Sequence, residues 1–365
     1  MTEVRVTWAE LFFDLVFVFA VTEVSTLLRG DQSWPGVVHS LVVFVPIYWV
    51  WVGTCVYANT HTIATALDRL GIFAIGLVGL FMALAVPQAY HDGGVLFGAC
   101  YLAARVVLFT LARRDGGFLP MTYLVALFVS GPLLVIGGFL PPTARVVVWA
   151  LAAVTDLATP AVKRRQLLRV QFAPGHLAER FGGFLIIALG ESIVAIGGPA
   201  AASHDLGAGT LGAVAAAFVL ACALWWVYYV FAASAVQHAL ANAVARTDII
   251  RRVLSYGHLS FIGAIIAVAV GLAGVIAHPG EVLHAGQVGL LFGGCALYLA
   301  TFGYTRWRMF GTVSRTRLTA AAVVVVLLPV AWFVPGLVAL SAVAAVVVVL
   351  NVVEHVIVRR QQKTD

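Results

Sequence analysis

Apolar stretches, each long enough for a membrane-spanning helix, follow one another along almost the whole chain. A bilayer core needs roughly 20 apolar residues for each helical crossing. Only 10% of the 365 residues are charged, whereas a typical soluble domain has about 25%. The pattern therefore predicts an all-α integral membrane protein.

Gly, Pro and charged residues divide the apolar stretches into about twelve expected transmembrane helices. The expected spans are 8–28, 36–57, 70–88, 94–112, 120–139, 144–160, 177–197, 209–234, 253–277, 284–304, 318–334 and 337–358. The first span carries Glu10, Asp14 and Glu23 and lacks a basic leader with a small-residue cleavage site. We therefore expect it to remain as a helix rather than to be removed as a signal peptide.

The basic residues alternate with these spans as the positive-inside rule requires if the N- and C-termini are both cytoplasmic. The segments that would face the cytoplasm contain Arg5, Arg69, Arg113, Arg114, Lys163, Arg164, Arg165, Arg169, Arg246, Arg251, Arg252, Arg306, Arg308, Arg315, Arg317, Arg359, Arg360 and Lys363. The opposite segments contain only Arg29 and Arg145, and an odd number of spans would break this alternation. Because topology accounts for the excess of 22 basic over 16 acidic residues, we expect no nucleic-acid partner.

Three short motifs occur twice in the same order, each time six spans apart. The paired stretches are 9–12 with 178–181, 48–51 with 225–228, and 96–100 with 291–295. Because six is an even number, the two halves would enter the membrane in the same direction and form two parallel six-helix repeats. The alternative is coincidence among apolar helices that draw on few residue types.

The repeat predicts three parts of the chain. Residues 1–162 would form the first six-helix repeat, residues 163–176 a basic cytoplasmic linker, and residues 177–365 the second repeat. The last two spans are separated only by Val334-Pro335-Gly336, which we expect to be a hairpin.

Several ionisable side chains fall inside the expected spans, where an unpaired charge costs at least ~2.5–3.5 kcal/mol, so such groups face the protein interior and pair. Glu10 and Asp14 are four residues apart and share one face of the first helix. Arg105 and Asp156 should lie at a similar depth, as judged from their distance to the basic residues that end their spans. We expect Arg105 to form a cluster with Asp14 and Asp156, which either binds a ligand or merely holds the helices together.

The seventh span contributes Glu179, Arg180 and Glu191. Arg180 and Glu191 are about 16 Å apart along a helix and cannot pair directly. Glu191 lies deep in its span, which suggests a carboxylate that binds a proton or a cation. His258, two turns into the ninth span near Tyr256, is either a proton relay or a hydrogen-bonded packing residue. The expected ion- or substrate-binding residues are Glu10, Asp14, Arg105, Glu179, Arg180, Glu191 and His258.

Known cofactor and metal motifs are not found in the sequence. Cys55, Cys100, Cys222 and Cys295 lie in apolar stretches without the spacing of a disulfide framework or a zinc site, so we interpret them as packing residues. The chain contains no phosphate-binding glycine loop, dinucleotide fingerprint or nucleophile elbow. We expect no metal and no cofactor.

Two long stretches, Trp8–Val18 and His176–Ile193, resemble the bacterial low temperature requirement protein A family. Leu224–Trp226 and Tyr256–Leu259 resemble it as well, so the resemblance extends over the first nine spans. It implies a multi-pass protein of the bacterial inner (plasma) membrane that is connected with growth in the cold, but no substrate.

Three functions are compatible with these features. Inward-facing acids and an arginine between two parallel halves favour a transporter, permease or channel for a small molecule or ion, with a proton or cation coupled to it. A membrane enzyme is the alternative, in which Glu10 and Asp14 would hold Mg²⁺ for a lipid or prenyl diphosphate. A sensor of membrane state or a scaffold is the third. We expect transport rather than catalysis.

Overall fold

The computed structural model describes residues 6–114, 120–202, 206–242 and 246–361, which are helical almost throughout. These residues contain no β-strand, and an antiparallel bridge joins Val282 to Pro335. Arg5 and Lys363, two of the basic residues in the topology prediction, lie outside the described residues. The all-helical class predicted from the sequence is confirmed.

The chain divides into two compact parts, which we call unit 1 and unit 2 and describe separately. Unit 1 consists of Met1–Phe184 and Val244–Arg251, and unit 2 of Leu185–Ala243 and Arg252–Asp365. The division between the units falls inside one long helix, α9 (Pro174–Ala202). The division into two repeats and a linker stays a prediction.

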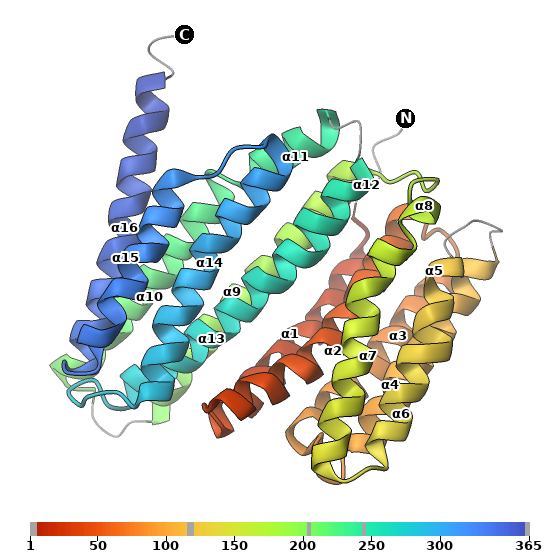
Figure 1. The fold of residues 1–365 in the computed structure, drawn as a ribbon, viewed down its shortest axis with the longest axis horizontal. Coiled ribbons are helices and arrows are strands. Elements are labelled where there is room, and N and C mark those ends of the chain that lie inside the picture. The colour runs from red at the N-terminus through yellow and green to blue at the C-terminus, as the bar shows by residue number, and fades with distance from the viewer. Residues whose placement is uncertain (1–5, 115–119, 203–205, 243–245, 362–365) are drawn as a thin grey trace. The chain divides into compact units, whose positions relative to one another are not determined.

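Unit 1 contains the helices shown from red to yellow-green in Figure 1. They are α1 (Trp8–Gly30), α2 (Trp34–Thr60), α3 (Ala66–Leu84), η1 (Val86–Gln88), α4 (Gly94–Arg113), α5 (Pro120–Val125), the π-helix η2 (Ala126–Ser130), α6 (Gly131–Gly138), α7 (Pro142–Val162), α8 (Arg164–Leu167) and the first part of α9, together with α12 (Arg246–Ile249).

Unit 2 contains the rest of α9 and the helices shown from green to blue in Figure 1. They are α10 (Ala208–Tyr229), α11 (Ala233–Asn242), most of the π-helix η3 (Ile250–Gly257), α13 (His258–Ala277), α14 (Ala285–Phe310), α15 (Arg315–Ala331) and α16 (Gly336–Gln361).

Ten helices of the described chain are long and apolar enough to cross a membrane. The two remaining expected spans are helical but shorter. The 120–139 span is an apolar helix, Tyr123–Gly138, which the π-helix η2 interrupts, and the 318–334 span is the 17-residue α15. The ten helices make this a multi-pass membrane protein, and the count of twelve stays a prediction.

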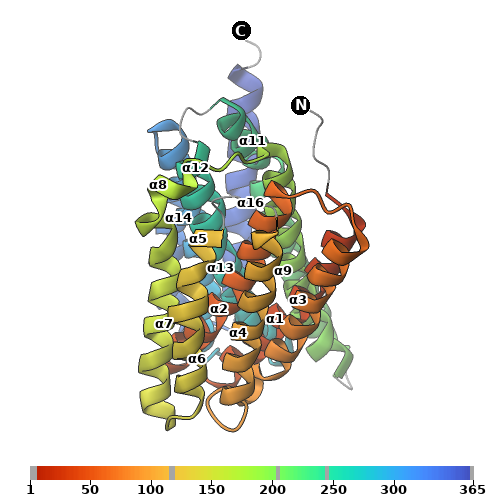
Figure 2. The same ribbon diagram turned by 90° about the vertical axis from the view of Figure 1, so that its right-hand side faces the viewer.

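Helix α2 is the central helix of unit 1. It contacts α1, α3, α4 and α7, and 83% of the residues in its most apolar 18-residue stretch are buried. The other helices surround it, because α1 packs on α3, α3 on α4, α4 on α6, and α6 on α7 (Figures 1 and 2). Gly98 permits the close contact of α4 with α6, because a Cβ at this position would clash with the backbone of Leu134.

The helices of unit 2 pack in a similar order. Helix α13 packs on α14, α14 on α15, and α15 on α16, while α10 contacts α13 and α16. Gly294 of α14 lies against the backbone of Ala264 in α13. This order resembles that of α3, α4, α6, α7 and α2 in unit 1.

Large apolar side chains cover the outside of the helices, while several charged side chains and two histidines are buried. Phe73, Leu77 and Phe81 on α3, for example, are each 40% or more exposed. Exposed apolar rows of this kind are typical of helices that face lipid. The interior positions, by contrast, include Glu10, Asp14, Arg105, Asp156, Arg180, Glu191 and His258.

Candidate functional site

Two acids project from the start of α1 on the same helical face. Thr7 caps the helix, and its backbone N–H and its hydroxyl both donate to Oε1 of Glu10, at 3.1 and 2.9 Å. This capping box leaves Oε2 of Glu10 free to bond elsewhere. Asp14 follows one turn later, and both side chains are buried.

Two bases project from the start of α9 with the same spacing. His176 and Arg180 are four residues apart and both are buried. Arg180 Nη1 donates to Glu10 Oε2, and Nη2 donates to Asp14 Oδ1 at 2.6 Å. One guanidinium therefore pairs with both carboxylates, an arrangement that suits the fixed fork of arginine donors.

Helix α2 closes this site with aromatic side chains. Trp51 donates its indole N–H to Oδ1 of Asp14 at 2.8 Å, so this oxygen accepts two hydrogen bonds. Phe184 stacks on the Trp51 ring at 4.1 Å, and Phe181 meets its edge at 4.9 Å. The rings shield the ion pairs from the surroundings, which strengthens the attraction between the charges.

Asn59 of α2 fixes the tautomer of His176. Its Oδ1 accepts from the backbone N–H of Ala173 at 3.0 Å, and its Nδ2 donates to the Ala173 carbonyl at 2.8 Å. The same Nδ2 lies 3.2 Å from His176 Nδ1. Because an amide nitrogen can only donate, Nδ1 must accept, and the proton of a neutral ring resides on Nε2.

Nε2 of His176 is directed at the same carboxylate as Arg180. It lies 3.0 Å from Glu10 Oε2, although the contact is too bent for a full hydrogen bond. With His176 neutral and both acids ionised, Glu10, Asp14 and Arg180 carry one net negative charge. We call the four residues Glu10, Asp14, His176 and Arg180 the acidic site.

Arg105 belongs to a second buried network in unit 1. Its Nη2 lies 3.9 Å from Asp156 Oδ2, and its guanidinium lies over the Tyr101 ring at 4.7 Å. Tyr101 donates to the same Asp156 oxygen at 2.5 Å. Within the described part of the chain, Nε and Nη2 of Arg105 have no hydrogen-bond partner.

The expected single cluster of Arg105, Asp14 and Asp156 is therefore corrected to two networks. The Arg105–Asp156 pair is present as expected, but Asp14 pairs with Arg180. The physical reason is that the sequence gives only the depth of a side chain along the membrane normal. The partner of that side chain also depends on which helix packs against its own.

The other expected residues lie apart from these networks. Glu191 is buried in the part of α9 that belongs to unit 2, and Glu179 is exposed. His258 of unit 2 is fully buried and pairs with Tyr228 across 2.7 Å.

Three residues of this network were not among the predicted ones: His176 of the acidic site, and Asn59 and Trp51, which bond to it. His176 lies one turn before Arg180, so a helix that began a few residues earlier than expected would have placed both on one face. No signal in the sequence connects Asn59 or Trp51 to this site.

The described residues include no group of three or more His, Cys, Asp or Glu side chains placed to hold a metal ion. Glu10 and Asp14, the proposed Mg²⁺ ligands of the enzyme hypothesis, are both paired with Arg180. A divalent cation would have to displace this guanidinium.

Buried ion pairs within a set of long apolar helices define a multi-pass membrane protein with a charged interior. The chain belongs to the family described as "Bacterial low temperature requirement A protein (LtrA)", whose family model matches residues 5–352. It is 30% identical over 315 residues to the uncharacterized protein RA0937 of Rhizobium meliloti (strain 1021), which covers 82% of this chain and 76% of that protein. No solved structure matches the chain.

Proposed function

We propose that this protein is a proton- or cation-coupled permease of the bacterial inner membrane, with both termini in the cytoplasm. Glu10 and Asp14 bind the coupling ion, and Arg180 is their counter-ion. The observation that carries the proposal is the sharing of one buried guanidinium by two buried carboxylates.

The charge balance of the acidic site supports ion binding. Isolated charge in a membrane interior costs at least ~2.5–3.5 kcal/mol, and the acidic site has one negative charge more than its arginine neutralises. A proton on one carboxylate, or a monovalent cation beside it, removes this imbalance. The excess charge thus favours cations over anions.

The geometry also supports exchange between two pairings. Arg180 donates through Nη1 to one acid and through Nη2 to the other. When a proton neutralises Asp14, the bond from Nη2 loses its ionic part, while the bond from Nη1 to Glu10 remains. Binding of the coupling ion therefore changes the force that α9 exerts on α1, as alternating access requires.

A measurement without a known substrate tests the proposal. Purified protein in liposomes on a solid-supported electrode is exposed to a jump in pH, Na⁺ or K⁺ concentration, and the transient charge displacement is recorded. We expect at least one jump to displace charge in the wild type, and Asp14→Asn to remove most of the displacement.

The exposed acid Glu281 offers a matched control. We expect Glu281→Gln to displace as much charge as the wild type. Wild-type charge displacement in Asp14→Asn protein that is folded, as judged by gel filtration, would refute the assignment of Asp14 as an ion-binding residue.

A further inference from the structure

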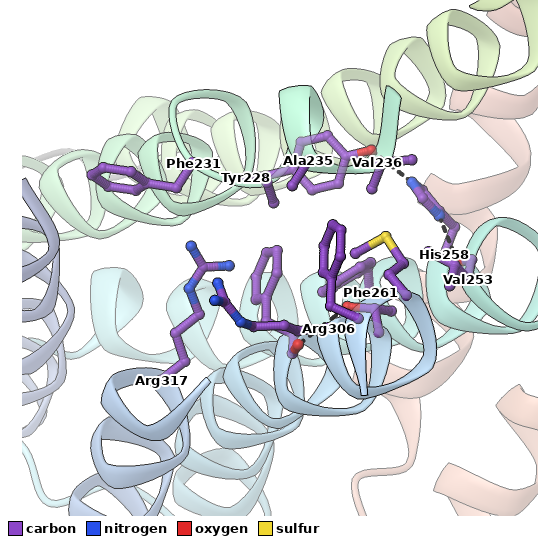
Figure 3. A pocket seen from close by; sticks show the side chains of 14 residues that line it. Tyr228, Phe231, Ala235, Val236, Val253, His258, Phe261, Arg306 and Arg317 are labelled. Atoms are coloured by element: carbon purple, nitrogen blue, oxygen red, sulfur yellow. Dashed lines mark hydrogen bonds between the residues drawn. The ribbon is translucent and has the colours of Figure 1, made fainter. Parts of the chain in front are cut away.

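Unit 2 contains a small cavity between the ends of α10, α13 and α14 (Figure 3). Its volume is about 30 Å³, and it is partly open to the outside of the unit. Tyr228, Phe231 and His258 line one part of it, and Arg306 and Arg317 another. Figure 3 shows both guanidinium groups reaching into the same space, opposite Phe231 and Tyr228.

The two arginines differ in their electrical role. Arg317 is buried and forms a two-pronged pair with Glu354, with both N···O distances at 2.8 Å, and this pair is neutral overall. Arg306 is exposed and has no ion-pair partner among the residues that the structure describes. The cavity therefore presents one uncompensated positive charge.

The remaining polar groups of the cavity bond to one another. His258 Nδ1 lies 3.2 Å from the carbonyl oxygen of Val253 and so carries a proton, which makes Nε2 the acceptor for the Tyr228 hydroxyl at 2.7 Å. The π-helix η3 places the Val253 carbonyl at this position. With the Tyr228 proton committed to His258, the arginines are the charged donors that a ligand can meet.

The size of the cavity limits what it can hold. A volume of about 30 Å³ accepts about two water-sized groups, whereas pockets for drug-sized organic molecules measure roughly 300–1,000 Å³. Only a small anionic group fits inside, and the rest of any larger ligand must lie outside the cavity.

The surface around the cavity suits such an outer part. Trp307 and Phe310 of α14 are 49% and 42% exposed, and Tyr304 is 39% exposed. Aromatic side chains of this kind are typical of the membrane–water boundary, where lipid headgroups lie. Arg306 and Arg317 flank the α14–α15 turn, which the positive-inside pattern assigns to the cytoplasmic side.

We propose that this cavity receives the two charged oxygens of the phosphate of an anionic phospholipid, with Arg306 as their main cationic ligand and the acyl chains along the exposed aromatic face of α14. Basic pockets between membrane helices recognise anionic headgroups in this way. The proposal is independent of ion coupling at the acidic site, because it uses only residues of unit 2.

Lipid binding to the purified protein tests the proposal. Detergent-solubilised protein is titrated with phosphatidylglycerol, phosphatidylcholine or inorganic phosphate, and the change in its melting temperature gives the apparent affinity. We expect phosphatidylglycerol to raise the melting temperature at concentrations where the other two have no effect. Arg306→Gln should weaken phosphatidylglycerol binding about fivefold, since one basic residue near a lipid surface contributes about 1 kcal/mol.

Arg315→Gln is the matched control, because Arg315 is exposed at the same turn but does not line the cavity. We expect it to bind phosphatidylglycerol like the wild type. Equal losses in the two variants would overturn the proposal in favour of general surface charge. Equal protection by inorganic phosphate would overturn the lipid assignment, and equal protection by phosphatidylcholine would overturn the requirement for an anion.

Discussion

Asn59 and His176 are 117 positions apart in the chain, yet the amide nitrogen of the first lies 3.2 Å from Nδ1 of the second. Because two bonds to Ala173 fix the orientation of the Asn59 amide, its nitrogen must donate to the ring. The position of the ring proton on the buried histidine is thus determined from α2, while the opposite ring nitrogen faces Glu10.

Asn59→Asp should reverse this arrangement. A carboxylate accepts a hydrogen bond where the amide donated one. We therefore expect Nδ1 of His176 to gain a proton, while Nε2 keeps its proton toward Glu10. Nitrogen NMR of protein with ¹⁵N-labelled histidine distinguishes the neutral ring of the wild type from the resulting imidazolium. Asn351→Asp, in unit 2, is the control and should leave the His176 signal unchanged. A neutral ring in Asn59→Asp would contradict the assigned tautomer.

Removal of Arg180 should be costly. Arg180→Gln leaves Glu10 and Asp14 buried without their counter-ion, and loss of one partner of a buried ion pair costs about 3–5 kcal/mol. We expect the free energy of unfolding in detergent to fall by this amount. Further substitution of Glu10→Gln and Asp14→Asn should recover part of the loss, because no unpaired charge then remains.

The exposed Arg165 provides the comparison for this series. Arg165→Gln should change the free energy of unfolding by less than about 0.5 kcal/mol. If the triple variant is no more stable than Arg180→Gln, the electrostatic explanation of the loss fails.

Gly53→Ala tests the packing around Arg105. The new Cβ would lie 2.8 Å from Arg105 Nη1 and 2.9 Å from Leu108 Cδ2, so these two buried side chains would have to shift within a packed interior. Overpacking costs about 1–3 kcal/mol, more than the roughly 1 kcal/mol that alanine gains over glycine in a helix. We expect a lower melting temperature.

Gly76→Ala is a matched variant in α3, because its nearest neighbour, Phe13, would be at an ordinary 3.6 Å from the Cβ. It should be neutral or stabilising. Equal melting temperatures for the two alanine variants would show that the space beside Arg105 is not tight.

Glu191→Gln tests the second predicted ion-binding carboxylate. The buried Glu191 would bind an ion in unit 2, as Asp14 is proposed to do in unit 1. We therefore expect Glu191→Gln to lower the charge displaced by a pH jump, but to leave the part that depends on Asp14. Unchanged charge displacement in folded protein would assign Glu191 a structural role.

The helices could be predicted closely because their length and apolar composition are local properties. The expected spans 94–112 and 144–160 correspond to Gly94–Arg113 and Pro142–Val162. The partners of the buried charges could not be predicted as well. Depth along a helix correctly paired Arg105 with Asp156, but it did not distinguish α4 from α9 as the neighbour of Asp14.

One small error in a helix boundary also hid His176, a residue of the acidic site. The seventh span was expected to begin at residue 177, which assigned His176 to the linker, but α9 begins at Pro174. The residues just before an apolar stretch are polar whether they belong to the helix or to the loop that precedes it. Hydropathy alone therefore does not locate the first turn of a helix.

The capping box of α1 connects the order of the first turn of this helix with the ion pair of Glu10. The two oxygens of Glu10 serve different structures, because Oε1 accepts from Thr7 while Oε2 accepts from Arg180. Any event that draws this carboxylate away from the guanidinium, or protonates it, also loosens the start of the helix. The beginning of α1 should therefore fray or tighten together with the occupancy of the ion site.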